Sequence, residues 1–244
     1  MRFAIFLLTL ILVANLNAET LHIGTLSYKP PFEVEADKQA HFFGFDIDIM
    51  NEICNRIQAD CHFIPLNFDE LFKSLLALKI ELAIGAITIT ATRQEFFLFS
   101  LPYLASSGQF ITRSTSNINT LADIREKRVG VVQGTLFKGF VMQKYQNLVQ
   151  VIEYSTLPEV FQALNNEDID ALFTDEGVAR YWAASNNTML KLVGEGLPIG
   201  IGYGIMANKT ETNLINRINK ALMDMEADGS YLKIYTRYFS KMSL

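Results

Sequence analysis

Short apolar runs that alternate with helical patterns constrain the fold of this chain more than any other feature of its sequence. An apolar run at 21–25 is followed by apolar residues at every fourth position from Phe45 to Ile57, and then by another apolar run at 62–66. The four-residue spacing indicates one face of a helix, and short apolar runs are typical of buried strands. Strands that alternate with helices predict an α/β fold whose sheets are mainly parallel and flanked by helices.

The first series continues with the start of a second helix. Asn67 followed by Glu70 matches an N-cap and its third-position partner. Leu71, Leu75 and Leu78 then predict a buried stripe along this helix. Because 50% of the residues are apolar and 19% are charged, the chain can bury such faces in a core.

A second series of the same kind begins after residue 110. The first series ends with a predicted strand at 81–87. The second series predicts strands at 128–132, 149–153, 170–173 and 190–193, and helices at 134–145, 157–165 and 178–184. Two such series predict two lobes. The last part, 211–227 and 231–239, predicts two helices separated by Gly229 with no strand between them. Because helices without a sheet of their own pack onto an existing one, we expect the chain to return to the first lobe.

The first residues have the pattern of a secretory signal peptide. Arg2 gives a positive start, 3–16 is nearly all apolar, and small Ala18 precedes a polar segment. This predicts a signal peptide over 1–18, cleaved after Ala18. A membrane anchor is the alternative, although the apolar run is short for a transmembrane helix. No cysteine follows the run, so we expect no lipidation there and a periplasmic location.

Export favours a disulfide between the two cysteines, Cys54 and Cys61. A metal site is the alternative, but it needs about four ligands with suitable spacing. His62 is adjacent, whereas His22 and His41 form no spaced cluster with it. We therefore expect a disulfide and no metal.

Charge and motifs exclude several classes of function. The formal net charge of -5 argues against a nucleic-acid-binding protein, which normally has a basic face. The segment 134–139 has phosphate-loop glycines, but Phe140 stands where that loop needs lysine. No G-x-S-x-G or H-E-x-x-H motif occurs. The acidic pair Asp46 and Asp48 fits a solvated face or a helix start. We expect neither a cofactor nor an enzyme.

Two segments lie where ligands bind in α/β sheets, directly after strands. The segment 85–93 runs from an apolar strand through small and hydroxyl residues to Arg93, which could bind a carboxylate through two parallel hydrogen bonds. The segment 132–135 leads into a helix, whose first N–H groups favour an anion. A surface arginine and an ordinary turn at Gly134 are the alternatives.

Characteristic segments follow one another in order along the chain: Gly44-Phe-Asp-Ile-Asp48, Thr88-Ile-Thr…Arg93, Gly134-Thr135, Thr174-Asp175 and Asp228-Gly229. On these segments the sequence resembles the polar amino-acid family of periplasmic binding proteins of ABC transporters, solute-binding family 3. It is most similar to the arginine and lysine/arginine/ornithine/histidine branch, and the resemblance covers roughly 21–239. The spacing of Cys54 and Cys61 also matches a disulfide of this branch.

The resemblance implies a two-lobed, type II periplasmic-binding-protein fold. Two hinge segments, near 106–113 and 200–207, would cross between the lobes. The first lobe would comprise 19–106 and 205–244, and the second 107–204.

The resemblance also implies roles for residues that would hold a free amino acid. Its α-carboxylate would meet Arg93, the backbone N–H of Thr88, and N–H groups near Thr135 and Leu136. The guanidinium of Arg93 would match both the negative charge and the planar geometry of the carboxylate.

The α-ammonium of the ligand would meet Asp175, the Thr88 hydroxyl and a carbonyl near Ala86. Phe68 would lie against the ligand side chain, and Tyr28 would form the opposite wall. Arg93 and Asp175 thus supply opposite charges to a zwitterion from the two lobes.

These roles predict a monomeric, non-enzymatic protein that binds a free L-amino acid, with arginine favoured, and delivers it by hinge closure to the membrane permease subunits of an ABC importer. One alternative is a cyclohexadienyl or arogenate dehydratase-like enzyme on the same fold, with Glu176 as its general acid. Another is an amino-acid-sensing role without uptake.

Two departures affect the choice of amino acid. Leu26 stands where many binders of basic amino acids carry an acidic residue for the distal cation. Lys29 replaces an aromatic residue, although Tyr28 is adjacent. A lysine at this position suits a cationic ligand only if it points outward. Glutamine and histidine are therefore alternatives to arginine.

Overall fold

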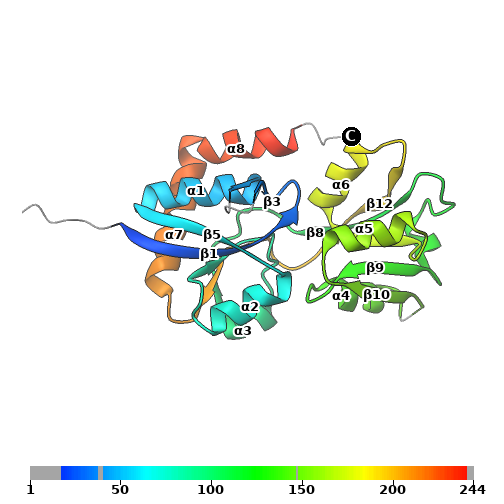
Figure 1. The fold of residues 1–244 in the computed structure, drawn as a ribbon, viewed down its shortest axis with the longest axis horizontal. Coiled ribbons are helices and arrows are strands. Elements are labelled where there is room, and N and C mark those ends of the chain that lie inside the picture. Colours follow the sequence, from blue (N-terminus) through cyan, green and yellow to red (C-terminus); the bar gives the residue numbers. More distant parts are fainter. Residues whose placement is uncertain (1–17, 38–40, 147, 241–244) are drawn as a thin grey trace, which may run out of the picture.

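The computed structural model of the chain describes residues 18–37, 41–146 and 148–240. Two five-stranded sheets lie side by side, one around β1 (Glu19–Leu26) and β5 (Ala59–Leu66) and the other around β9 (Arg128–Val132) and β10 (Gln150–Tyr154) (Figure 1). The predicted signal peptide, except for Ala18, lies outside the described residues. Among the described residues, no helix is both long and apolar enough to cross a membrane.

The first sheet has the strand order β5-β1-β6-β13-β7. Its strands are β1 (Glu19–Leu26), β5 (Ala59–Leu66), β6 (Leu82–Ala83), β7 (Phe97–Phe99) and β13 (Met206–Asn208). β1 pairs in parallel with β5 and β6, whereas β13 is antiparallel to both β6 and β7. The predicted strand at 81–87 is shortened to two residues, and the segment after it has an irregular backbone with a positive φ at Ala86.

The second sheet has the order β10-β9-β11-β8-β12. Its strands are β8 (Ser107–Arg113), β9 (Arg128–Val132), β10 (Gln150–Tyr154), β11 (Ala171–Asp175) and β12 (Leu190–Pro198). β8 is antiparallel to its neighbours β11 and β12. In each sheet the one reversed strand, β8 or β13, is the first that the chain forms after crossing from the other sheet.

Two crossing segments connect the sheets and contact each other. The N–H of Tyr103 donates to the carbonyl of Tyr203, and the N–H of Tyr203 donates to Leu104 O, at 2.9 and 2.8 Å. The N–H of Ile199 donates to Ser106 O at 3.1 Å. These bonds hold the two connections together at the junction of the lobes.

Most helices follow the sequence pattern, which gives no indication of the short helix at 91–96 or of the 3-10 turn at 121–124. The first sheet carries α1 (Phe45–Ile57), α2 (Phe68–Leu76) and α3 (Ala91–Phe96), and the second carries α4 (Phe137–Lys144), α5 (Leu157–Asn165), α6 (Glu176–Ser185) and the 3-10 turn η1 (Leu121–Ile124). Asn67 and Glu70 form the predicted capping box. Leu71 and Leu75 are fully buried, but the prediction for Leu78 is wrong. Leu78 lies beyond the end of α2 with a positive φ and is 67% exposed.

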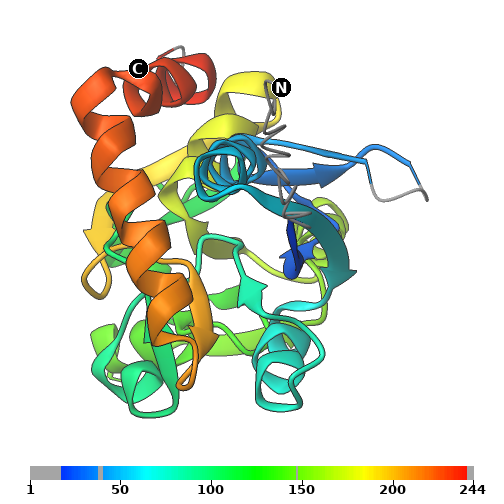
Figure 2. The same ribbon diagram turned by 90° about the vertical axis from the view of Figure 1, so that its left-hand side faces the viewer.

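The last two helices return to the first lobe, as expected. α7 (Thr212–Asp228) and α8 (Ser230–Phe239) contact each other and α1. Figure 2 shows this pair, in orange and red, on the side of the molecule that carries α1. Phe45 of α1 is fully buried, and the centroid of its ring lies 4.9 Å from that of Phe239 in α8. The C-terminal helices therefore complete the core of the first lobe.

Sequence patterns give no indication of a small third sheet. It consists of β2 (Tyr28–Lys29), β3 (Glu33–Glu35) and β4 (Phe42–Phe43), in that order. Strands of two or three residues have too few positions to show an alternation. This sheet lies next to the cleft and orients several of its side chains.

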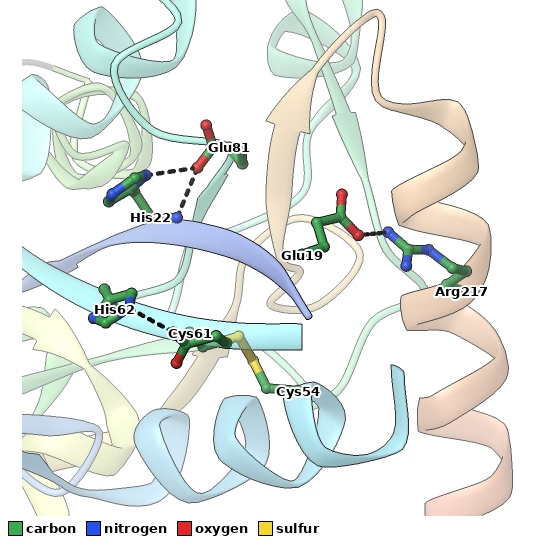
Figure 3. Close-up of a disulfide and its surroundings, with 8 residues drawn as sticks. Glu19, His22, Cys54, Cys61, His62, Glu81 and Arg217 are labelled. Carbon is green, nitrogen blue, oxygen red and sulfur yellow. Dashed lines mark hydrogen bonds and ion pairs between the residues drawn. A yellow bond between two sulfur atoms is a disulfide. The ribbon is translucent and has the colours of Figure 1, made fainter. Parts of the chain in front are cut away.

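Cys54 of α1 and Cys61 of β5 form the predicted disulfide (Figure 3). Among the described residues, no group of His, Cys, Asp or Glu could hold a metal ion. The bridge joins the end of a helix to the strand that follows it.

We expect replacement of both cysteines by alanine to lower the free energy of unfolding by about 2–3 kcal/mol, because the bridge closes a short loop in the unfolded chain. Denaturant unfolding of the oxidised protein and the double variant measures this. A reducing agent should destabilise the natural protein by a similar amount and leave the double variant unchanged. Equal stability of the two oxidised proteins would contradict the expectation.

Candidate functional site

A cavity of about 190 Å³ lies between the two lobes. Leu26, Leu66, Val132 and Asp175, the last residues of β1, β5, β9 and β11, all line it. It is further lined by Ser27, Tyr28, Lys29, Asn67, Phe68, Thr135, Phe137, Ser155, Thr156, Leu157, Pro158 and Thr174. The cavity thus opens at the carboxyl ends of strands from both sheets, where α/β proteins bind ligands.

The two lobes touch around this cavity. The rings of Tyr28 and Trp182 pack edge to face with centroids 6.5 Å apart. A Cβ atom added to Gly134 would lie 3.2 Å from Cβ of Asp69. The lobes are therefore in a closed arrangement.

Arg93 lies in the first turn of α3, where Thr90 caps the helix by accepting a hydrogen bond from the N–H of Arg93 at 3.2 Å. Its Nη1 donates to the carbonyl of Thr88 at 2.9 Å. The guanidinium lies over Phe68 and Phe72, at 5.4 and 4.9 Å from their ring centroids. These contacts fix the direction of the side chain while leaving most of its donors unused.

Arg93 remains charged at neutral pH. Burial lowers its pKa to about 10, and nearby Asp175 counteracts this shift. No carboxylate among the described residues forms an ion pair with Arg93. A half-buried guanidinium without such a partner can bind an anion.

Most of the predicted ligand-binding residues line one or the other of two hollows. Tyr28, Phe68, Thr135 and Asp175 line the 190 Å³ cavity. Arg93 and Leu136 line a second hollow of about 420 Å³, together with Phe72, Thr90, Thr92 and Gly134. The helix α4 begins at Phe137, directly after Thr135 and Leu136, so its first N–H groups have no carbonyl partner within the helix.

Thr88 and Ala86 lie on the segment between β6 and α3, and both are buried. The carbonyl of Thr88 accepts from Arg93, and Thr88 pairs with Tyr203 of the crossing segment. Ala86 has a positive φ of 48°, and its N–H donates to Oδ2 of Asp46 at 2.8 Å. Neither residue lines the two hollows, so the structure brings them near the site but not onto its walls.

Asp175 ends β11 and is buried, with two partners. The hydroxyl of Tyr203 donates to Oδ1 at 2.6 Å, and Nζ of Lys29 lies 2.9 Å from Oδ2. Lys29 therefore points inward, so the condition under which it would suit a cationic ligand is not met. Its Nζ also donates to the carbonyl of Gly85 at 3.1 Å.

Two buried carboxyl groups behind Lys29 are not predicted as part of the site. Glu33 is fully buried, and neither of its oxygens has a hydrogen-bond partner among the described residues. Burial, with a further contribution from Asp46, raises its pKa well above the usual range. Asp46 starts a helix, as expected, but it is fully buried rather than solvated.

Asp46 accepts hydrogen bonds from the N–H of Ala86 and from the hydroxyl of Tyr103, the latter at 3.0 Å. Burial raises its pKa from 3.8 to about 6, although these two hydrogen bonds lower it. Because the folded state holds this proton more tightly than the unfolded state, the contribution of Asp46 to stability is largest at low pH. It is lost as the pH rises through about 6.

We therefore expect the natural protein to lose about 2 kcal/mol of stability relative to Asp46→Asn between about pH 4 and pH 7. An asparagine keeps an acceptor for both hydrogen bonds and carries no titrating group. Denaturant unfolding across this pH range is the measurement, with Asp224→Asn on the surface of α7 as control. If the difference in free energy of unfolding between the natural protein and Asp46→Asn stayed constant across this pH range, the raised pKa of Asp46 would be contradicted.

Glu176 lies outside the two hollows described above, in a separate one that Ser107, Arg180 and Tyr203 also line. Its Oε1 pairs with Nε of Arg180 at 2.7 Å, and its Oε2 accepts from the Ser107 hydroxyl. Burial raises its pKa, but these two partners outweigh burial and lower it overall. A carboxyl group with a lowered pKa is a poor general acid at neutral pH.

Known proteins resemble the chain over nearly its whole length. ABC transporter arginine-binding protein 1 of Escherichia coli (strain K12) is 30% identical over 226 residues, which are 91% of each chain. The arginine 3rd transport system periplasmic binding protein from Legionella pneumophila is 41% identical, with a TM-score of 0.87 over 91% of this chain and 100% of that chain. An ancestral arginine-binding protein bound to glutamine is 35% identical, with a TM-score of 0.82 over 90% and 97%.

The family model of the bacterial extracellular solute-binding proteins, family 3, matches residues 21–241. These residues include both sheets except the first two residues of β1, the two crossing segments and every side chain of the cavity between the lobes. The chain therefore belongs to the bacterial extracellular solute-binding proteins of family 3, with their two-lobed, type II periplasmic-binding-protein fold.

Proposed function

We propose that the protein binds a free L-amino acid in the periplasm and delivers it to the permease subunits of an ABC importer. The observation that carries this proposal is the placement of opposite charges: Arg93 comes from the first lobe and Asp175 from the second. The names of the relatives, an ABC transporter arginine-binding protein and a periplasmic binding protein among them, support it. Arginine is the first ligand to test.

The roles proposed for the site residues follow from the charges of an amino acid. Removing both charges of the zwitterion from water is costly unless each is paired. We assign the α-carboxylate to Arg93 and to N–H groups at Thr88, Thr135 and Leu136. Charge-assisted hydrogen bonds of this kind contribute about 1.5–3 kcal/mol each.

The α-ammonium is assigned to Asp175, the Thr88 hydroxyl and a carbonyl next to Ala86. Phe68 and Tyr28 would enclose the ligand side chain, since both line the cavity. Because the contacts come from both lobes, only the closed form makes all of them, and ligand would stabilise closure. The lobes would be bounded as the sequence predicts, 19–106 with 205–244 and 107–204, in a monomer.

Neutral polar amino acids such as glutamine are the second candidate class. Among the described residues that line the cavity, Asp175 is the only acidic one, and Leu26 stands where a distal cation would need a carboxylate. One structural relative, an ancestral arginine-binding protein, has been solved with glutamine. The choice between arginine and glutamine thus depends on groups beyond the shared α-amino-acid contacts.

A thermal-shift screen of the purified mature protein against the twenty amino acids, ornithine, citrulline and prephenate tests the proposal. A ligand at about a hundred times its dissociation constant should add roughly 2.7 kcal/mol of stability. A large shift with arginine or glutamine supports binding, and silence across all amino acids, after removal of copurified ligand by unfolding and refolding, would contradict it.

We propose that the protein has no enzymatic activity. The carboxylate of Glu176, the candidate general acid of a dehydratase, is held by Arg180 and Ser107, and its lowered pKa makes it a poor proton donor at neutral pH. Turnover of prephenate by the purified protein would contradict this part of the proposal. Deletion of the gene separates transport from sensing: a transport role requires that uptake of the ligand falls.

A further inference from the structure

We infer that Lys29 is a built-in occupant of the ammonium subsite, which holds the cleft closed and which an incoming amino acid must displace. This inference rests on the proposed binding of an α-amino acid. It concerns Lys29, a residue to which the family resemblance assigns no ligand contact.

The surroundings of the Lys29 ammonium are those expected for a ligand ammonium. Nζ lies 2.9 Å from Oδ2 of Asp175 and 3.1 Å from the carbonyl of Gly85. It lies over the rings of Phe32 and Phe68, at 5.7 and 5.8 Å from their centroids. A carboxylate, a carbonyl and aromatic faces are the preferred partners of a primary ammonium. Asp175 and a carbonyl beside Ala86 are also the groups assigned to the ligand.

Strand pairing explains why Lys29 points inward. Successive side chains of a strand point to opposite faces. In β2, Tyr28 is 39% exposed and packs on Trp182, so the next residue, Lys29, faces the interior. Lys29 pairs in register with Glu33 of β3, which is also fully buried.

Charge then decides how Lys29 and a ligand interact. The carboxyl groups that influence this region are Glu33 on β3, Asp46 on α1 and Asp175 on β11, and the nearby cation is Arg93 on α3. Oδ1 of Asp175 already accepts a hydrogen bond from the Tyr203 hydroxyl, and Oδ2 forms the ion pair with Lys29. A second ammonium could reach that carboxylate only if Lys29 leaves, because two like charges at one buried position repel.

The same ion pair joins the two lobes. Lys29 belongs to the small sheet of the first lobe, and Asp175 to the second sheet. The side chain of Lys29 is only 8% exposed and that of Asp175 3%, so solvent screens this pair little. The protein thus carries its own ammonium for closing the cleft, and an amino acid gains less from its α-ammonium than it would in a site without Lys29.

Lys29→Met tests the inference, since methionine keeps an unbranched stem without the charge. The matched control is Lys220→Met, which removes a lysine from an exposed ion pair with Asp224 on α7. Calorimetric titration compares L-arginine, or the amino acid that gives the largest thermal shift, with its deamino analogue.

We expect Lys29→Met to bind the amino acid about tenfold tighter or more, equivalent to about 1.4 kcal/mol, and the deamino analogue no tighter. Lys220→Met should bind both like the natural protein. Unchanged or weaker binding of the amino acid by Lys29→Met, or an equal gain for both ligands, would overturn the inference. Lys29→Tyr serves as a second uncharged variant if the methionine variant does not fold.

Small-angle scattering of the ligand-free proteins keeps this test separate from the proposed function. The radius of gyration should be larger for Lys29→Met than for the natural protein and Lys220→Met, because the cross-lobe ion pair is gone. If no amino acid binds to any of the proteins, the proposed function fails. An unchanged radius of gyration would still overturn the role of Lys29 in closure.

Discussion

Replacement of Arg93 by alanine is expected to weaken binding of the cognate amino acid by about a hundredfold to ten-thousandfold. The guanidinium has no ion-pair partner among the described residues and is oriented by Thr88 and two phenylalanine rings. Loss of two charge-assisted hydrogen bonds to a carboxylate, at about 1.5–3 kcal/mol each, gives a factor of this size. Calorimetric titration of Arg93→Ala measures it.

Arg217→Ala is the matched control, because Arg217 of α7 forms an exposed ion pair with Glu19, the first residue of β1 (Figure 3). It should bind the ligand normally. Arg93→Lys keeps the charge but not the planar fork of donors, so its affinity should lie between those of the alanine variant and the natural protein. Near-native affinity of Arg93→Ala would exclude the carboxylate role.

Replacement of Asp175 by asparagine is expected to lower the free energy of unfolding by about 3 kcal/mol, because it leaves the buried ammonium of Lys29 without its counter-ion. The same change should abolish detectable binding of an α-amino acid, since the ligand ammonium loses the same carboxylate. Denaturant unfolding and calorimetric titration measure the two effects.

A second substitution separates these effects. In the Asp175→Asn background, Lys29→Met removes the unpaired charge, so the double variant should recover most of the lost stability. It should not recover binding, because the carboxylate is still missing. If Asp175→Asn were as stable as the natural protein, the ion pair with Lys29 would have no energetic importance.

The sequence was sufficient for elements whose apolar pattern is long and regular. The helix α1 begins and ends at Phe45 and Ile57, the first and last residues of the four-residue repeat, and α5 covers the predicted range. Helices of this length bury one face along their whole length, so their pattern is local. The short strands β7 and β13 have no such pattern, because their place in the sheet depends on partners far away in the chain.

The candidate site divides in the same way. Arg93, Asp175, Thr135 and Phe68 are predicted from their places after strands and from the family resemblance, and the structure brings Asp175, Thr135 and Phe68 to one cavity with Arg93 beside it. Glu33 and Asp46 are missed. The sequence indicates their burial only through their neighbours: Glu33 directly follows Phe32, and Asp46 directly follows Phe45, and both phenylalanines are buried.

The sequence by itself determined the α/β class, the two series of elements, the disulfide partners and the chemical types of the binding groups. All of these depend on residue type and on spacing along the chain. The tertiary structure decided that Lys29 points inward and pairs with Asp175, since this follows from the pairing of two-residue β2 with β3 and from the contact between lobes. Burial of a charge depends on what surrounds it in three dimensions, and a local sequence pattern does not contain that information.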